Sequence, residues 1–502
     1  MNDEMQSILE KQIVMDLEQN CSAIHTIFEE SVDLSERDFI LGMNNEQKGT
    51  IYYFDGLVNT RVIETGILRP LQHHSLKLKN IEDLQNKVLQ TASGKIVSTY
   101  SEAVDGLFIG NTLLFLDGFN KALVLNTIGG ENRAVDEPST EPVIRGPRDG
   151  FNENIRTNTA LVRKRIHDPH FRLESSIVGV KTKNTLNIAY IKGTVKEGLI
   201  DEIKARLDRI EIDGILDSGY IEEFIDDAPL SPFVTSQSTE RPDKVAASLL
   251  EGRAAIFVEN SPFAIIVPST FWQFIQASDD YYSRYYVGSF FRMIRLAAFF
   301  ISLTLPSLYV LVSSFHHEMV PTALALTIAS GREVIPFPVL FEVLIMEFAF
   351  ELMREAGLRM PRPIGSAVSI VGSLVIGQAA VQAGIVGPFA VIIVAVTGIA
   401  SFAIPNYAIS FSLRIVRFPI LIASGTMGLL GFGAIIMMII MHVLSLRSFG
   451  EPYLTPLSPF RPNEQKDIII RVPWWMMKKR PQIAQNKKRQ RDEAKPAKPK
   501  NK

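Results

Sequence analysis

The sequence predicts an α/β N-terminal region, folded as two αβ subdomains, followed by an α-helical membrane domain. Three observations support this fold class. With 502 residues the chain has room for more than one domain. Up to about Tyr286 its composition is that of a soluble α/β protein, in which short apolar runs alternate with turn signals. After Arg292 it contains uncharged apolar runs long enough to approach the ~20 residues that a spanning helix needs.

The first subdomain is predicted at residues 31–143, after a leading helix at residues 1–30 whose isoleucines and leucine recur at helical spacing. Within the subdomain, "TIYYFDGLVN", "GKIVSTY" and "TLLFLDGFNKALVLNT" contain apolar runs that alternate with turn signals, which predicts strands. The Gly- and Pro-rich run "GGENRAVDEPSTEPVIRGPRDG" is predicted to connect this subdomain with the next one.

The second subdomain is predicted at residues 144–285. Three of its runs favour helices: "FNENIRTNTALVRKRI", "VKEGLIDEIKARLDRI" and "PDKVAASLLEG". "LNIAYIKG" favours a strand, and "AAIFVENSPFAIIVP" favours two strands joined by the turn "ENSP". The order of these runs predicts a second αβ module.

The membrane domain is predicted at residues 286–450. Its spans are expected at about residues 296–314, 364–384, 386–405 and 418–446, with an amphipathic helix at 337–357. The acidic N-terminal half and the basic C-terminus both favour the cytoplasm, which requires an even number of spans.

The span count stays open at this stage. Four spans place arginines outside, against the positive-inside rule, among them Arg354, Arg359, Arg362, Arg414 and Arg417. A fifth span at the amphipathic helix makes the number odd.

Residues 451–502 are predicted to be a cytoplasmic segment with a basic disordered tail; attraction of that tail to anionic lipid is the alternative.

The amphipathic helix "VLFEVLIMEFAFELMREAG" carries carboxylates that are costly in a bilayer. Its candidate site residues lie on or near one helical stripe: Glu347, Glu351, Glu355, Arg354 and Arg359. Glu342 lies well round the other side. The stripe is interpreted as the lining of a cation path or as a subunit contact. A solvated face with ordinary ion pairs is the alternative.

The span at 364–384 has two different faces. Small residues occupy one face, which is assigned to helix packing rather than to pore lining: Ser366, Ser369, Ser373 and Gly377. The opposite face is predicted to hold a hydrophobic gate and a wider polar part: Val368, Val371, Val375, Gln378 and Gln382. In the alternative, both glutamines bond to another helix and the valines meet lipid.

Catalytic motifs are missing from the sequence. It has no G-x-G-x-x-G, P-loop, H-E-x-x-H or G-x-S-x-G pattern. Cys21 is the only cysteine, which excludes an internal disulfide framework and a multi-cysteine metal site. The start of the chain has no secretory signal pattern. The sequence therefore predicts a protein that is no enzyme, needs no cofactor or metal and binds no nucleic acid.

Long blocks of the chain carry a family resemblance. They include "IRGPRDGFNENIRTNTALVRKRI", "TERPDKVAASLLEGRAAIFVENSPFAIIVP", "DDYYSRYYVGSFFRMIRLAAFF" and "SFGEPYLTPLSPF". With these blocks the chain resembles the A-subunit family of bacterial spore germinant receptors, from about Asp33 to Phe460.

The resemblance implies a subunit of a nutrient receptor in the spore inner membrane, with cytoplasmic N- and C-terminal regions. It also implies three sets of partners: a transporter-like B subunit that binds the nutrient, a lipoprotein C subunit, and further A subunits around a pore that releases cations. A secondary transporter component, or a non-conducting membrane scaffold for germination proteins, is the alternative. The transporter is disfavoured because the sequence shows no internal repeat.

Overall fold

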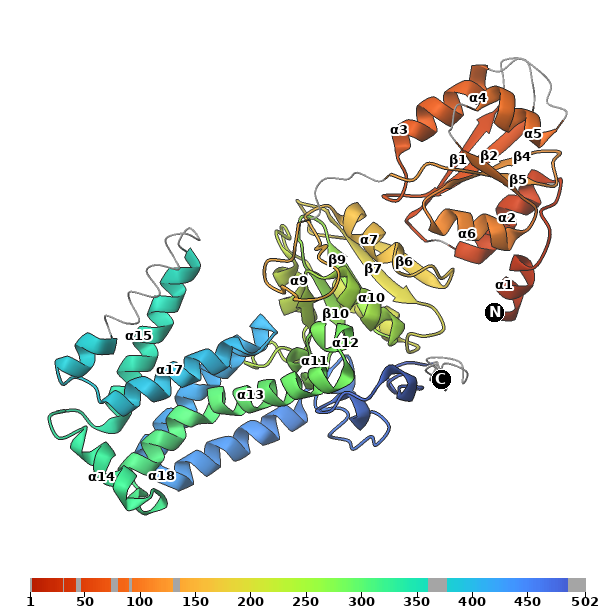
Figure 1. Cartoon of the computed structure of the whole chain (residues 1–502). Coiled ribbons are helices and arrows are strands. Elements are labelled where there is room, and N and C mark those ends of the chain that lie inside the picture. The colour runs from red at the N-terminus through yellow and green to blue at the C-terminus, as the bar shows by residue number, and fades with distance from the viewer. Residues whose placement is uncertain are drawn as a thin grey trace, which may run out of the picture. The chain divides into compact units, whose positions relative to one another are not determined.

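The structure, a computed structural model, describes residues 2–29, 31–41, 47–73, 80–89, 93–129, 136–359 and 377–485. The chain divides into two units (Figure 1). The N-terminal unit comprises Met1–Asp226, Ser236–Pro268 and Met477–Lys502, and the helical unit comprises Asp227–Thr235 and Ser269–Met476. The N-terminal unit holds two αβ subdomains, so the predicted fold class is confirmed.

The first subdomain is built on a five-stranded antiparallel sheet with strand order β1-β2-β4-β5-β3. The strands are β1 (Leu34–Ile40), β2 (Lys48–Phe54), β3 (Gly94–Val97), β4 (Thr112–Leu116) and β5 (Ala122–Leu125). In register, Ile51 lies opposite Leu114 and Leu113 opposite Val124. Successive side chains of a strand point to opposite faces of the sheet. Because apolar residues occupy both odd and even positions of these strands, both faces of the sheet are buried.

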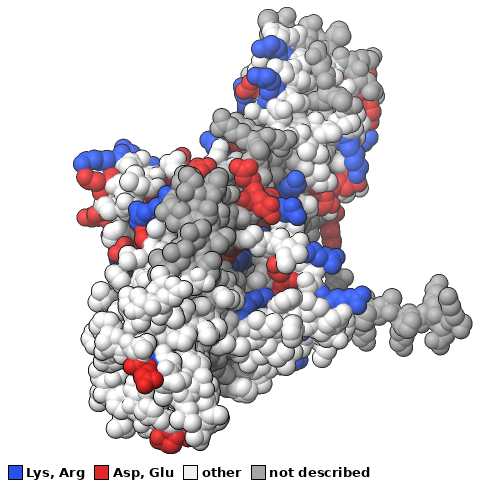
Figure 2. Space-filling model, turned by 60° about the vertical axis from the view of Figure 1, so that its left-hand side comes forward, with Lys and Arg blue, Asp and Glu red and all other residues white. Residues whose placement is uncertain are grey.

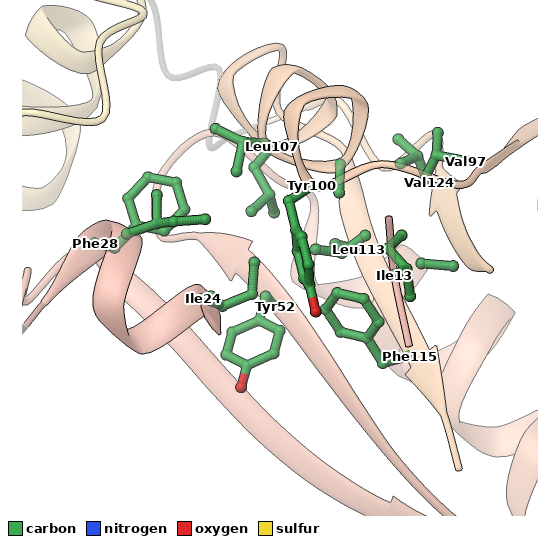
Figure 3. Packing of buried hydrophobic residues seen from close by; sticks show 14 of the residues in the cluster. Ile13, Ile24, Phe28, Tyr52, Val97, Tyr100, Leu107, Leu113, Phe115 and Val124 are labelled. Carbon is green, nitrogen blue, oxygen red and sulfur yellow. The ribbon is translucent and has the colours of Figure 1, made fainter. Parts of the chain in front are cut away.

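Helices cover both faces of this sheet. One face packs against α2 (Leu17–Phe28) and α6 (Tyr100–Phe108), through Ile24, Phe28 and Leu107 (Figure 3). Short helical segments cover the other face: α3 (Thr60–Val62), η1 (Ile63–Leu68), α4 (Arg69–His73), α5 (Ile81–Asp83) and η2 (Leu84–Val88).

The leading segment forms two helices where the sequence predicts one, α1 (Asn2–Leu9) and then α2. Between them the chain is extended, because the Ile13 amide donates to the Ser98 carbonyl beside strand β3. Asp16 then caps α2 by accepting a hydrogen bond from the Glu18 amide at 3.1 Å. Pairing with a distant strand therefore overrides the helical periodicity.

The second subdomain has strand order β6-β7-β9-β10-β8, again fully antiparallel. The strands are β6 (Phe171–Val178), β7 (Asn184–Ile191), β8 (Gln237–Thr239), β9 (Ala254–Val258) and β10 (Ala264–Val267). One face packs against α7 (Ile155–Arg163) and α10 (Pro242–Leu250). The remaining helices are α8 (Leu199–Leu207) and α9 (Ser218–Ile225), and α9 contacts β10.

The two subdomains repeat one topology. In each, a helix precedes two strands, helical segments lead to the third strand, and one helix separates it from the last two strands. The spatial order of the five strands is the same in both sheets. The sequence shows no internal repeat, but the N-terminal unit contains a structural one.

A buried ion pair joins the subdomains. Arg163 of α7 donates from Nε and Nη2 to the Asp33 carboxylate, at 2.7 and 2.9 Å. Its guanidinium carbon lies 4.6 Å from the ring centroid of Phe54 and 4.2 Å from that of Phe171. The Arg163 guanidinium forms two hydrogen bonds with the carboxylate and stacks on two aromatic rings, so a lysine at this position would not reproduce these contacts.

The connector also packs on the second subdomain. The Glu240 carboxylate accepts hydrogen bonds from the amides of Ser139 and Thr140 at 2.8 and 3.3 Å. Glu141 pairs with Lys244 at 2.6 Å. The connector is therefore held in place from Ser139 onward.

The helical unit contains three principal long helices, α13 (Tyr285–Ser314), α15 (Val339–Arg359) and α18 (Tyr407–Ser445). Its shorter elements are α11 (Phe271–Ile275), α12 (Asp279–Tyr282), η3 (His317–Met319), α14 (Thr322–Ser330), α17 (Pro388–Phe402), β11 (Arg447–Ser448), β12 (Glu451–Pro452), η4 (Gln465–Asp467) and η5 (Trp474–Met476). Residues 377–382 are helical as well. Helix α13 packs against both α17 and α18.

Within the described residues, α13 and α18 are the two helices long and apolar enough to cross a bilayer, and α17 is a shorter apolar helix. Helix α18 has a kink at Gly428, whose φ of 59° favours glycine. In Figure 2 the helical unit presents a broad surface on which Lys, Arg, Asp and Glu are sparse. Much of this apolar surface is exposed in the isolated chain, as expected of a lipid-facing surface.

Candidate functional site

Helices α15 and α18 enclose a cluster of charged side chains. Arg417 of α18 lies with Nη1 3.0 Å from Oε2 of Glu347 on α15, and their side chains are 2% and 0% exposed. The other terminal nitrogen of Arg417, Nη2, lies 3.4 Å from Oε1 of Glu351. One arginine therefore spans two carboxylates one helical turn apart.

A second arginine of α18, Arg414, lies one turn before Arg417. Its Nη1 is 3.8 Å from Oε2 of Glu351, and its Nη2 donates to the Ser410 hydroxyl at 2.9 Å. Both arginines are buried. In the sequence they form an i,i+3 pair that faces the α15 stripe.

Arg354 of α15 reaches the same cluster. Its Nη1 lies 4.0 Å from Oε2 of Glu351. The guanidinium carbon also lies 5.2–5.5 Å from three ring centroids, those of Phe402, Tyr407 and Phe411. Aromatic faces attract a cation, so these rings supply part of the environment that water would otherwise provide.

The predicted acidic stripe runs from a buried to an exposed end. The side chains of Glu347, Glu351 and Glu355 are 0%, 27% and 55% exposed. At the exposed end Arg359 pairs with Glu355 at 2.6 Å in an i,i+4 contact. At the buried end Glu347 forms an ion pair with Arg417, and the exposed end is an ordinary surface ion pair.

Glu342 belongs to a separate site on the other side of α15. Its buried carboxylate lies 2.8 Å from Nη2 of Arg332 and accepts a hydrogen bond from the Gly387 amide at 3.0 Å. Gly387 is the N-cap of α17, so the carboxylate also meets the positive end of that helix. This contact fixes α17 to α15.

The cluster carries more positive than negative charge. Within the part of the chain that the structure describes, Arg354, Arg414 and Arg417 face two carboxylates, those of Glu347 and Glu351. Among the described residues, Nε of Arg417 and both Nε and Nη1 of Arg414 have no hydrogen-bond acceptor. The arrangement neutralises both carboxylates and holds two helices together.

Only part of the predicted gate lies within the residues that the structure describes. Val368, Val371 and Val375, and the small residues Ser366, Ser369 and Ser373, lie in 360–376, outside the described part. Gln378 and Gln382 are exposed, Gly377 is buried, and Ala380 packs against the cluster around α15 and α17.

Sequence reasoning did not assign Arg332, Arg414 and Arg417 to a site. The available signal was their position: two arginines at i,i+3 spacing in the otherwise uncharged run "NYAISFSLRIVRFPI". A buried charge requires a partner, so these arginines predict carboxylates on a neighbouring helix.

The N-terminal unit contains a cleft of about 1060 Å³. Polar or charged residues make up half of its lining, among them Asp55, Asn154, Arg156, Lys164 and Glu259. No histidine, cysteine or serine is among the residues that line it. In the described part of the chain, no group of three or more His, Cys, Asp or Glu residues is arranged to hold a metal ion.

Fold and site together define a class of membrane-associated protein in which an αβ unit is joined to a helical unit with buried ion pairs. The family model described as Bacillus/Clostridium GerA spore germination protein matches residues 22–483. The chain therefore belongs to the GerA family of spore germination proteins, and the resemblance inferred from the sequence is confirmed. Its members are germinant receptor subunits and are not known as enzymes.

Several relatives match over most of the chain. The uncharacterized membrane protein YfkQ of Bacillus subtilis (strain 168) is 44% identical over 479 residues, which is 95% of this chain and 93% of that protein. Spore germination protein KA of the same organism is 46% identical over 454 residues, covering 90% and 84%. Spore germination protein B1 is 40% identical over 472 residues, covering 94% and 97%.

One solved structure is also similar. It is the N-terminal domain of the A subunit of the Bacillus megaterium spore germinant receptor GerK3, 31% identical to this chain. The match covers 52% of this chain and 98% of that one, with a TM-score of 0.39.

Proposed function

We propose that the chain is the A subunit of a nutrient germinant receptor in the spore inner membrane. In this proposal several copies surround a pore that releases cations at the start of germination. A transporter-like B subunit binds the nutrient, and a lipoprotein C subunit completes the receptor. The N- and C-terminal regions face the cytoplasm, and the N-terminal unit acts there in assembly and gating.

The observation that carries the proposal is the pairing of charges inside the helical unit of a GerA-family chain. A helix bundle that only anchors a soluble domain has no need of buried arginines and glutamates, which are costly in a bilayer. Here they join α15 to α18. Such pairs give the unit a fixed internal frame against which another helix can move.

The gate is proposed at Val368, Val371 and Val375, with Gln378 and Gln382 lining a wider part. The exposure of both glutamines supports this, because amides without a partner are poorly placed in lipid. Apolar constrictions close by dewetting, so the width of the valine ring sets the closed state. The small-residue face, with Gly377, packs against neighbouring helices.

The experiment is ion release from cells or liposomes that carry the receptor with Val375→Ala. A widened constriction is expected to leak ions without nutrient. Val396→Ala on α17, at an exposed position, is the matched control and is expected to stay closed. Ser373→Val is expected to reduce assembly. A Val-to-Ala series that stays closed and opens normally with nutrient would contradict the gate.

A further inference from the structure

Two segments far apart in the sequence form an exposed aromatic surface in the helical unit. The first turns of α13 contribute Tyr285, Tyr286 and Phe290, and η5 contributes Trp474 and Trp475. These side chains belong to residues that are 43–57% exposed. Ring centroids of Tyr285 and Trp475 lie 6.4 Å apart, and those of Tyr285 and Tyr286 lie 5.6 Å apart. We call these five residues the aromatic patch.

Buried polar contacts hold the two segments together beneath the patch. Arg292 of α13 donates from Nη1 to the Asp467 carboxylate at 2.8 Å and from Nε to Asp280 at 2.8 Å. Arg471 donates from Nη1 to the carbonyls of Asp280 and Ser283, at 2.6 and 3.0 Å. The exposed rings are therefore placed by a fixed framework.

This framework also explains why α13 carries charge near its start. Asp280 is fully buried between Arg292 and Arg295. Burial alone raises the pKa of its carboxyl, but the hydrogen bonds and charges of these arginines outweigh burial and lower it. Arg292 faces Asp280 and the C-terminal segment, and Arg295 faces Asp280 and the Ile275 carbonyl. Tyr286, Phe290 and other apolar side chains of α13 are exposed.

The position of the patch along α13 matches the headgroup layer of a bilayer. Tyr285 and Phe290 are five residues apart, which corresponds to ~7.5 Å along a helix. The headgroup layer is about 5–7 Å thick on each side of the hydrocarbon core. Tyr and Trp are enriched at this level because each ring has an apolar body and a polar group. Arg284, exposed and bonded to the Tyr286 hydroxyl at 3.2 Å, adds a cation there.

We propose that the aromatic patch lies in the phospholipid headgroup layer and anchors residues 468–476 to the membrane surface at the start of α13. Exposed Ile469 and Ile470 extend the apolar side of this segment. Lys478 and Lys479, which follow in the sequence, suit anionic headgroups. The proposal requires membrane insertion of α13 but does not require ion conduction, so either can fail without the other.

The test uses tryptophan fluorescence of the full chain in proteoliposomes of phosphatidylcholine and phosphatidylglycerol. The chain has three tryptophans, so Trp272→Phe leaves only Trp474 and Trp475. Quenchers are lipids labelled at the headgroup, lipids brominated deep in the acyl chain, and acrylamide in the water. The matched control carries Trp474→Phe and Trp475→Phe and retains Trp272, which is 9% exposed.

Headgroup quenchers are expected to reduce the Trp474/Trp475 signal at least twofold more than deep bromines do. They are expected to leave the Trp272 control nearly unchanged. Strong acrylamide quenching without lipid quenching would place the segment in water and overturn the proposal. Protection from every quencher would place it under another protein chain, which also overturns it.

A second measurement avoids substitutions. The full chain without substitutions, labelled with 5-fluorotryptophan, gives three fluorine resonances. Lipids with a headgroup spin label are expected to broaden two of them, those of Trp474 and Trp475. Broadening of none, or equal broadening of all three, would contradict the placement.

Discussion

Glu347 and Arg417 form a fully buried ion pair between α15 and α18, with Nη1 3.0 Å from Oε2. Seventy residues separate them in the sequence. Both charges are removed from water, so each depends on the other for compensation. The pair fixes how the acidic helix meets the long apolar helix.

Glu347→Gln is expected to destabilise the helical unit, because it leaves Arg417 buried with reduced compensation. Breaking a buried pair costs about 3–5 kcal/mol. The measurement is the unfolding midpoint of the full chain in detergent. Glu355→Gln, at the exposed end of the same stripe, is the control and is expected to change stability by less than ~0.5 kcal/mol. Glu347→Gln combined with Arg417→Gln is expected to recover part of the loss; a double variant as unstable as the sum of both would contradict the pairing.

Glu351→Gln tests whether the stripe acts on ions. Glu351 is half-buried and touches three arginines at 3.4–4.0 Å, so its removal leaves the Glu347–Arg417 pair in place. We expect normal assembly with reduced or less selective cation flux. Co-purification of the receptor subunits and ion release from liposomes measure the two effects. Loss of assembly would indicate a structural ion pair, and no effect on either would indicate a solvated face.

A fragment boundary tests the role of the leading segment. Residues Ile24, Ile27 and Phe28 are fully buried in the first subdomain. Burial of such side chains contributes about 1.5–3 kcal/mol each, and a domain has only about 5–15 kcal/mol in total. The fragment Asn2–Pro268 is expected to fold and to melt cooperatively, whereas Ser31–Pro268 is expected to unfold or aggregate. Equal melting temperatures for the two would show that the leading helices are dispensable.

Glu222 predicts a pH dependence in the same fragment. Burial raises the pKa of its carboxyl above the ordinary 4.5, although the hydroxyls of Ser236 and Ser238 donate to it. With a raised folded pKa, its stabilisation is complete at pH below 4.5 and is lost as the pH rises through the folded pKa. The wild-type fragment is therefore expected to lose stability as the pH rises above 4.5, and Glu222→Gln is expected to remove this loss.

Urea unfolding of the fragment between pH 4 and 8 measures this effect. Glu223→Gln, at an exposed position on the same helix, is expected to leave the pH profile unchanged. A Glu222→Gln profile that matches the wild type would show that the carboxyl is not perturbed by burial.

Local pattern was sufficient for the inner strands. Strands β4, β5, β9 and β10 are uniformly buried, and their apolar runs with intervening turns are visible in the sequence. Strands β1, β6 and β8 were not predicted. All three are edge strands, and most exposed positions of β1 and β6 carry polar residues, as in "LSERDFI" and "FRLESSIV", so the alternation is weak.

The candidate site could be predicted only in part. The acidic stripe and its pairs with Arg354 and Arg359 follow from helical spacing, which is local. The partners Arg414 and Arg417 come from a helix some seventy residues away, and no local rule brings that helix to α15. The shared topology of the two αβ subdomains could not be predicted from the sequence either. Two segments with the same apolar pattern can adopt the same fold without having identical residues.

The most direct measurement of the central claim is ion release from liposomes that contain the purified A subunit with its B and C partners. Potassium release is followed with and without the cognate nutrient, and vesicles without the A subunit are the control. The proposal predicts rapid, nutrient-dependent release that requires the A subunit and becomes constitutive in Val375→Ala. Assembled receptor that binds nutrient but releases no ions, or that shows only saturable, stoichiometric uptake of a solute, would contradict it.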